Sequence, residues 1–238
     1  MSGTVAIDCF ASSLDRYRDG YAVVAVDVIR ATTTAATAVA AGRRCFPVPS
    51  LEVAVPLAAR LDDPLLVGEL GGNMPYGFHV QNSPAQLADR ADLSRPMILL
   101  STSGTGLIYK ARGAEAVYAA CLRNYSAQAE RLASRHDRIA LVGAGTRNEF
   151  REEDQLCCAW IAERLISAGF DPGDERTHAL VERWSGAPVD AITASKSAHY
   201  LGETGQLRDL DYILAHVDDL NTVFALKGEE LVMVPPNP

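Results

Sequence analysis

The sequence predicts an α/β protein, a three-layer α/β/α fold built on a mostly parallel, mixed sheet. Short runs of β-branched and apolar residues alternate along the chain with segments of helical pattern, which is typical of this class. Residues 21–26 form a continuous apolar run, as in a strand that is buried on both faces. The 238 residues are 48% hydrophobic and 22% charged, which is ordinary globular usage. We expect a single domain over residues 1–238, or two lobes that share one sheet.

In the first part of the chain, the strand signals are short apolar runs at residues 5–10, 21–26, 45–48 and 65–67. Two helices fit between them. The first covers residues 32–41, consists of small residues and ends at Gly42, a typical C-terminal cap. Ser50 caps the second, which reaches about residue 61 and carries Glu52 near its positive end.

The regular pattern stops between residues 68 and 84, where glycine and proline punctuate the chain. A loop of this length inside a compact domain is typically functional. Beyond it, the pattern predicts strands at residues 97–100, 116–119, 139–142, 222–226 and 230–234. Helices are predicted at residues 105–112, 126–134 and 152–168, and a helical region runs from residue 174 to about 216.

Composition and charge exclude several functions. The chain has 22 Lys and Arg against 30 Asp and Glu, a net charge of −8, and no basic stripe, so we expect no nucleic-acid partner. We find no signal-peptide pattern, and no apolar stretch approaches the ~18 residues of a membrane span. We therefore expect a cytoplasmic protein with no membrane partner. The five cysteines lack zinc or disulfide spacing and are expected to be buried thiols. The sequence leaves open whether the chain forms a homo-oligomer.

Four polar clusters follow predicted strands, where ligands gather in α/β folds. The first covers residues 27–34. Asp27 can coordinate Mg²⁺ or act as a nucleophile, and Arg30 can bind a phosphate with two donors. Thr32 and Thr33 add hydroxyls at the start of the next helix, which favours anions. The alternative is that Asp27 only caps this helix.

The second cluster is the loop at residues 68–84. Its glycines permit close approach of the backbone, Glu69 is a candidate metal ligand and Asn82 is a candidate donor to a charged oxygen. The alternative is an ordinary glycine-rich surface loop. His79 stands alone, without a partner at metal-ligand spacing, so a structural role is favoured.

The third and fourth clusters add hydroxyls and carboxylates. Residues 101–105 read Ser-Thr-Ser-Gly-Thr, a turn that can cradle phosphate, although no lysine stands at P-loop spacing. Residues 143–146 read Gly-Ala-Gly-Thr, a weak dinucleotide signal, and Glu153 and Asp154 follow at a helix start. The alternative for residues 101–105 is an ordinary capped turn. The alternative for Glu153 and Asp154 is that the helix dipole favours carboxylates at a helix start. Together, the four clusters suit Mg²⁺ and a small phosphate ester as the substrate.

These stretches, in this order, resemble the 2-phosphosulfolactate phosphatase family of coenzyme M biosynthesis. The matching residues are the run 26–34, Gly68-Glu69, Gly71-Gly72, Gly77-Phe78, Asn82-Ser83-Pro84, Thr102, Gly104-Thr105, Asn124, Ala144-Gly145 and Glu153-Asp154. The resemblance implies an α/β fold and a Mg²⁺-dependent phosphatase that acts on phosphate esters of 2-hydroxycarboxylic acids.

The resemblance also implies a set of metal and phosphate residues, which are Asp27, Arg30, Glu69, Asn82, Thr102, Thr105, Glu153 and Asp154. The individual roles are our own inference, and we expect them as follows. The catalytic residues are Asp27, Arg30 and Glu69. The phosphate-binding residues are Thr32, Thr33, Asn82, Thr102, Ser103, Gly104, Thr105 and Asn124. The Mg²⁺ ligands are Asp27, Glu69, and Glu153 or Asp154. The nucleophile is either water or Asp27.

Three positions depart from the family's usual pattern. The chain has Leu70 where the family has Arg, His79 where it has Asp, and Ser103 where it has Asn. The loss of a guanidinium removes an expected two-donor contact to an anion. A sugar or nucleoside phosphate is therefore an alternative substrate. A non-catalytic anion-binding protein, or phosphoryl transfer to another acceptor, are alternative functions.

Overall fold

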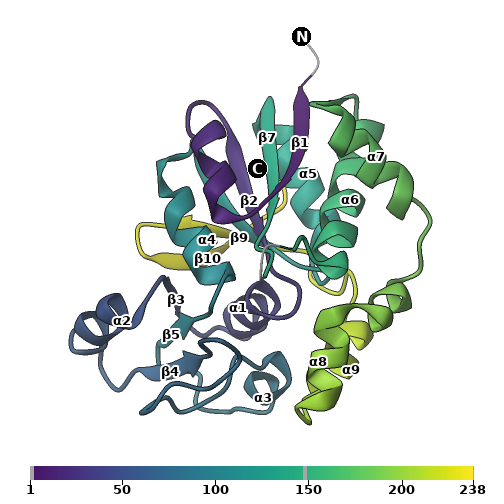
Figure 1. The fold of residues 1–238 in the computed structure, drawn as a ribbon. Helices are drawn as coiled ribbons and strands as arrows, with labels where there is room; N and C mark the ends of the chain where they lie inside the picture. The colour runs from purple at the N-terminus through teal and green to yellow at the C-terminus, as the bar shows by residue number, and fades with distance from the viewer. Residues whose placement is uncertain (1–2, 147–148, 238) are drawn as a thin grey trace.

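Ten strands form one mixed sheet in the computed structural model, which describes residues 3–146 and 149–237 (Figure 1). The strands are β1 (Thr4–Cys9), β2 (Ala22–Val26), β3 (Cys45–Val48), β4 (Leu65–Gly68), β5 (Met97–Leu100), β6 (Ala116–Ala120), β7 (Arg138–Gly143), β8 (Asp171–Pro172), β9 (Val223–Lys227) and β10 (Glu230–Val234). Their order across the sheet is β4-β5-β3-β10-β9-β6-β2-β7-β1-β8.

The sheet consists of two parallel halves that an antiparallel hairpin joins. Strands β4, β5 and β3 are parallel to one another, and so are β6, β2, β7, β1 and β8. The hairpin β9–β10 lies between them, with β10 antiparallel to β3 and β9 antiparallel to β6. In Figure 1 the larger half lies above this hairpin and the smaller half below it. The predicted mixed, mostly parallel sheet is confirmed.

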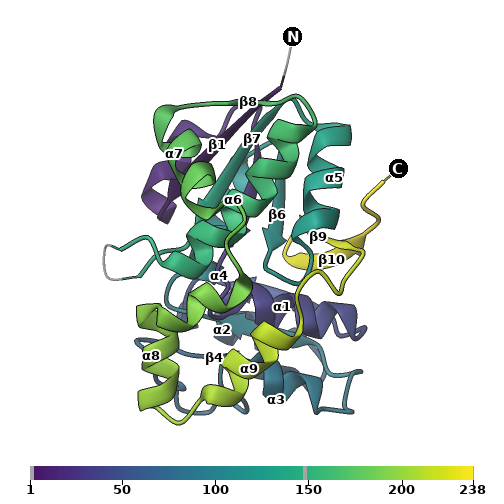
Figure 2. The same ribbon diagram turned by 90° about the vertical axis from the view of Figure 1, so that its right-hand side faces the viewer.

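Nine α-helices surround the sheet in the described part of the chain. They are α1 (Ala31–Ala40), α2 (Leu51–Ala58), α3 (Pro84–Ala88), α4 (Gly104–Lys110), α5 (Tyr125–Arg135), α6 (Glu152–Ser167), α7 (Glu175–Trp184), α8 (Lys196–Glu203) and α9 (Leu207–Ala215). Short 3₁₀ helices cover Ala11–Arg16, Ala111–Gly113 and Val189–Ala194. Helix α9 packs against α3 and α8 below the larger half of the sheet (Figure 2). None of the described helices is long and apolar enough to cross a membrane.

The side chains of β2 explain why residues 21–26 are apolar throughout. Successive side chains of a strand point to opposite faces. Val23 and Ala25 enter a core with α1 and α4, whereas Ala22, Val24 and Val26 enter a second core with α5 and α6. Helices therefore cover both faces of this half, as the sequence predicts.

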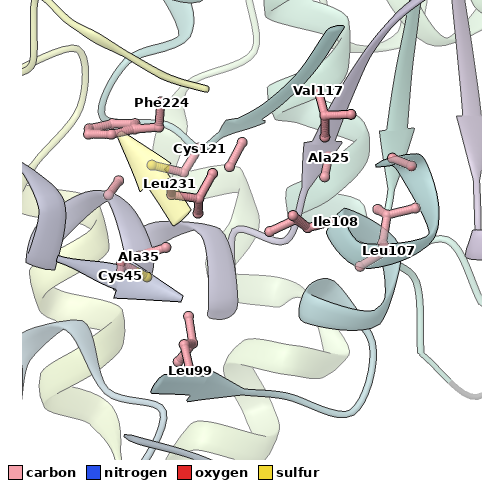
Figure 3. Close-up of a cluster of buried hydrophobic side chains, with 14 of the residues drawn as sticks. Ala25, Ala35, Cys45, Leu99, Leu107, Ile108, Val117, Cys121, Phe224 and Leu231 are labelled. Carbon is pink, nitrogen blue, oxygen red and sulfur yellow. The ribbon is translucent and has the colours of Figure 1, made fainter. Parts of the chain in front are cut away.

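The first of these cores is shared by the two halves of the sheet. It contains Ala25 of β2 and Val117 of β6 from the larger half, and Cys45 of β3 and Leu99 of β5 from the smaller half (Figure 3). Helices α1 and α4 contact strands of both halves. This arrangement brings the ends of distant strands close to one another.

The helical region predicted at residues 174–216 is divided into α7, a 3₁₀ helix, α8 and α9. Gly186 and Gly205 have positive φ angles, +66° and +70°, which end helices α7 and α8. The short helix α3 follows the long loop: Ser83 caps it, and Pro84 is in its first turn.

Candidate active site

A cavity of about 670 Å³ opens where the carboxyl ends of four strands meet. Its wall includes Asp27 and Arg30 after β2, Glu69 and Asn82 after β4, Thr102 and Ser103 after β5, Thr146 and Arg151 after β7, and side chains of α8. Strands β4 and β5 belong to one half of the sheet, and β2 and β7 belong to the other. The cavity therefore depends on both halves.

Asp27 lies at the end of β2 and is held by the first turn of α1. The Thr32 hydroxyl accepts from Asp27 N at 2.9 Å and donates to Asp27 O at 2.8 Å. The Ala31 N–H donates to the carboxylate. Gly104 lies directly beside it, because a Cβ at this position would be 2.3 Å from Asp27 Oδ2. A glycine at the start of α4 thus allows close approach to this carboxylate.

The pKa of Asp27 is raised from its ordinary value of 3.8 to about 7. Burial is the largest cause, since it disfavours the charged form, and the negative charges of Glu69 and Glu153 act in the same direction. The Ala31 N–H and the charge of Arg30 oppose these effects only in part. Asp27 is thus a carboxyl group that titrates near neutral pH when no cation is bound.

Glu69 joins the loops after β4 and β5. Its Oε1 accepts from Thr102 N at 2.7 Å, and its Oε2 accepts from the Thr102 hydroxyl at 2.7 Å and from Gly72 N at 2.8 Å. The Thr102 hydroxyl in turn accepts from Gly71 N at 2.8 Å. These bonds fix the position of the carboxylate and of the polar turn opposite it.

Arg30 precedes α1 and is 5% exposed on the cavity wall. Its Nη1 donates to Asp209 Oδ2 and to Gln206 Oε1, both at 2.5 Å. Because both bonds use Nη1, the guanidinium can still offer Nη2 and Nε to an anion.

Asn82 lies on the same wall and is 3% exposed. Its Oδ1 is buried and has no hydrogen-bond partner among the described residues. A buried acceptor that lacks a partner is unfavourable, and such atoms are often those that contact a ligand or ion.

Glu153 and Asp154 lie at the start of α6, and neither is among the described residues on the cavity wall. Burial raises the pKa of Glu153, against hydrogen bonds from the Ser197 and Ser195 hydroxyls. Its Oε2 has no partner in the described part of the chain. Ser197 does line the cavity, so Glu153 lies one side chain behind the wall.

Asp154 supports the turn after β2. Its Oδ1 accepts from Val28 N at 2.8 Å, and the Gly145 N–H also donates to it. Burial, and then the charges of Asp27 and Glu153, raise the pKa of Asp154 well above its usual range. The four predicted ligands are therefore carboxyl groups that repel one another: the charges of Glu69 and Glu153 act on Asp27, and those of Asp27 and Glu153 act on Asp154.

The donor chemistry at this site fits a hard divalent cation. In residues 3–146 and 149–237, no group of three or more His, Cys, Asp and Glu side chains is arranged to hold a metal ion. The oxygen atoms are nevertheless of the kind that Mg²⁺ prefers. A cation would offset the like charge that raises the Asp27 pKa, and Asn82 Oδ1 and Glu153 Oε2 are buried acceptors without a partner among the described residues.

Several predicted phosphate ligands lie behind the cavity wall that the described residues form. They are Thr32, Thr33, Gly104 and Thr105. The Thr33 hydroxyl donates to Val28 O at 2.8 Å, and the Thr105 hydroxyl bonds to the Ser101 backbone. Their hydroxyls thus stabilise the turns that carry the wall residues.

Asn124, also predicted to bind phosphate, lies away from the described cavity wall. The structure places it at the start of α5, where Oδ1 accepts from Cys121 N at 3.1 Å and Nδ2 donates to Thr222 O at 3.2 Å. It is absent from the described wall residues. The side chain makes no capping hydrogen bond to α5. Both ends of the amide instead bond to backbone, that of the turn before the helix and that of the segment before β9.

Helix α8 provides wall residues that the sequence did not indicate. Lys196, His199, Tyr200 and Glu203 recur at helical spacing and line the cavity. The Tyr200 hydroxyl donates to Gly72 O at 3.3 Å, so α8 also contacts the loop after β4. The spacing of three, four and seven residues was a signal for one face of a helix, but no strand precedes this segment closely enough to place it at the sheet edge.

Fold and site together define an α/β protein with a carboxylate- and hydroxyl-lined cavity at the carboxyl ends of its strands. The model of the 2-phosphosulpholactate phosphatase family matches residues 10–229, and the chain belongs to this family. This confirms the resemblance seen in the sequence.

Similar proteins carry the name probable 2-phosphosulfolactate phosphatase. One from Thermotoga maritima is 38% identical over 204 residues, which cover 85% of this chain and 88% of the relative. Another from Symbiobacterium thermophilum is 35% identical over 202 residues, covering 80% and 85%. A third from Carboxydothermus hydrogenoformans is 33% identical over 193 residues, covering 80% of each.

Proposed function

We propose that the protein hydrolyses the phosphate monoester of a small 2-hydroxy acid, such as 2-phosphosulfolactate, with Mg²⁺ bound at its buried carboxylates. The observation that carries this proposal is the meeting of Asp27, Arg30, Glu69 and Asn82 in one cavity from three chain segments. The names of the relatives support the choice of substrate.

Asp27 and Glu69 are the wall carboxylates that would hold Mg²⁺, with Asn82 Oδ1 as a further oxygen donor and Glu153 contributing from behind Ser197. When bound, the ion supplies Lewis-acid stabilisation of the negative charge that develops on the phosphoryl group. Asp154 would stay a supporting carboxyl group, because its Oδ1 already accepts from Val28 N.

Arg30 would bind the phosphoryl oxygens through Nη2 and Nε, and the Ser103 hydroxyl, which lines the same cavity, would donate a further hydrogen bond. Either water attacks phosphorus directly, or Asp27 attacks it and water then hydrolyses the aspartyl phosphate. In both routes the bond between phosphorus and the alcohol oxygen breaks, and that oxygen takes up a proton. The products are free phosphate and the 2-hydroxy acid.

The three departures from the family pattern differ in their relation to the cavity. Ser103 lines it, but Leu70 and His79 do not belong to the described wall. His79 Nδ1 accepts from Leu66 N at 2.9 Å, which is a structural contact next to β4. This supports a substrate of the family's type over a sugar or nucleoside phosphate.

The test is release of free phosphate from a panel of esters, with Mg²⁺ and with EDTA. The panel includes 2-phosphosulfolactate, other 2-phospho-hydroxyacids, sugar phosphates and nucleoside phosphates. We expect turnover that EDTA abolishes, that Asp27→Asn lowers at least ~100-fold, and that Asp62→Asn, at an exposed acid outside the cavity, leaves unchanged. A folded wild-type protein that releases no phosphate from any ester would refute the proposal.

A further inference from the structure

The carboxylate of Asp209 connects two parts of the candidate active site. It lies in the first turn of α9, is 3% exposed, and does not belong to the described residues on the cavity wall. Its Oδ2 accepts from Arg30 Nη1 at 2.5 Å. Its Oδ1 accepts from the Ser83 hydroxyl at 2.6 Å and from Ala85 N at 3.2 Å.

Two of these contacts lead to a residue on the cavity wall. Arg30 lies on the wall itself, and Ser83 directly follows Asn82, the wall residue with a buried, unpartnered oxygen. Ser83 also caps α3, because its hydroxyl accepts from Gln86 N at 3.1 Å. Asp209 therefore holds the turn that carries Asn82 and the guanidinium of Arg30 at a fixed separation.

The physical chemistry of the contact explains why its geometry is strict. A buried carboxylate is costly unless it is paired and its oxygens accept hydrogen bonds. Here both oxygens are used, and the partner guanidinium is 5% exposed. Since Arg30 meets Asp209 and Gln206 through Nη1 only, the pairing fixes the plane of the guanidinium and leaves Nη2 and Nε for an anion.

We infer that Asp209 is a positioning residue. It orients Arg30 toward the phosphoryl group and keeps Asn82 at a fixed distance from Arg30. This inference rests on the proposed function. It assigns the role to a residue that lies 179 positions from Arg30 along the chain and acts on the site through Arg30 and Ser83.

The variant that tests the inference is Asp209→Asn. The amide oxygen can still accept from Ser83 and Ala85, whereas the amide NH₂ would face the Arg30 donor, so the substitution breaks the Arg30 contact selectively. We expect kcat/KM for the best phosphate ester to fall about 100-fold, through a lower kcat and a higher KM, as for a misplaced group that binds the phosphoryl oxygens. The matched control is Asp211→Asn, an exposed acid on the same helix, which should leave kcat/KM unchanged.

A double-mutant cycle separates positioning from a general effect on folding. If Asp209 acts through Arg30, Asp209→Asn should lower kcat/KM by a factor at least ~10-fold smaller in an Arg30→Ala background than in the wild type, because the effects of coupled residues are not additive. The unfolding midpoint is measured for all variants. Costs that simply multiply, or a lowered midpoint with unchanged kcat/KM, would overturn the inference.

Binding of inorganic phosphate, measured by calorimetry on the same variants, tests the inference without turnover. We expect Asp209→Asn to weaken phosphate binding at least ~10-fold and Asp211→Asn to have no effect. If the wild type hydrolyses no ester but shows this difference, the proposed reaction fails and the positioning role stands. If the wild type is active while Asp209→Asn matches Asp211→Asn in both assays, the positioning role fails alone. A wild type that binds no phosphate would also overturn the positioning role.

Discussion

Replacement of Asp27 by Asn should change how the stability of the protein depends on pH. In the folded state the pKa of Asp27 is about 7, against an ordinary value of 3.8, because the group is buried and faces Glu69 and Glu153. Below pH 3.8 the carboxyl group is protonated in both states. Between pH 3.8 and about 7 the folded state keeps a proton that the unfolded state has lost, so the free energy of unfolding falls as the pH rises through this window.

The magnitude follows from the size of this rise in pKa. Each pKa unit corresponds to about 1.4 kcal/mol, so ionised Asp27 costs the folded protein about 4 kcal/mol above pH 7. The variant Asp27→Asn has no such titration and can still accept from the Ala31 N–H. The free energy of unfolding of the variant minus that of the wild type should therefore increase by about 4 kcal/mol between pH 4 and pH 8.

The assay is urea denaturation of both proteins in EDTA at a series of pH values. Comparison of the two proteins cancels the titration of groups that they share, and Asp62→Asn serves as an exposed control that should show no such trend. If the difference in the free energy of unfolding between variant and wild type stays constant from pH 4 to pH 8, the argument that burial and like charge raise the pKa of Asp27 is refuted. Addition of Mg²⁺ at pH 8 should stabilise the wild type more than the variant, because a ligand stabilises the state that binds it.

Three further substitutions have expected outcomes. Gly104→Ala would place a Cβ 2.3 Å from Asp27 Oδ2 and should cost about 1–3 kcal/mol and most of the phosphate release, whereas Gly106→Ala in the same helix meets nothing within 4 Å and should be neutral or stabilising in urea denaturation. Equal effects of the two would contradict the close-approach argument. Asn124→Ala loses two hydrogen bonds to backbone and should lower stability by about 1–3 kcal/mol with KM unchanged; a raised KM would instead return this residue to phosphate binding. Glu69→Gln cannot keep all three accepted hydrogen bonds, so both the urea midpoint and the rate of phosphate release should fall, and a fully active, fully stable variant would exclude the linking role of this carboxylate.

The elements of the fold were predictable where the signal is local. Residues 45–48 and 97–100 are short apolar runs bounded by polar or turn residues, and the structure contains β3 and β5 at these positions. Strand β8 has only the residues Asp171–Pro172, and it exists because they pair with the start of β1. No pattern within two residues can indicate such a pairing. The position of the β9–β10 hairpin in the middle of the sheet likewise depends on contacts between distant segments.

The candidate site was predictable where residues follow strands. The rule that ligands gather at strand ends indicates Asp27, Glu69 and Thr102, and the structure brings these residues to one cavity. The same rule also selected Asn124, because an asparagine that bonds to nearby backbone after a strand has the same local pattern as one that binds a ligand. Tyr200 and Asp209 could not be found in this way, since the packing of α8 and α9 against distant loops decides where they lie.

The hairpin in the middle of the sheet has a consequence for the order in which the protein can be assembled during synthesis. Each parallel half consists of strands that precede residue 223, but β3 and β6 have no ladder between them until β9 and β10 are present. Every described residue on the cavity wall comes earlier in the chain, the last being Glu203. A nascent chain that has been synthesised only through α9 thus contains all the described wall residues. It still lacks β9 and β10, the strands that link the two halves of the sheet. The two halves of the sheet can thus be joined only after β9 and β10 have been synthesised.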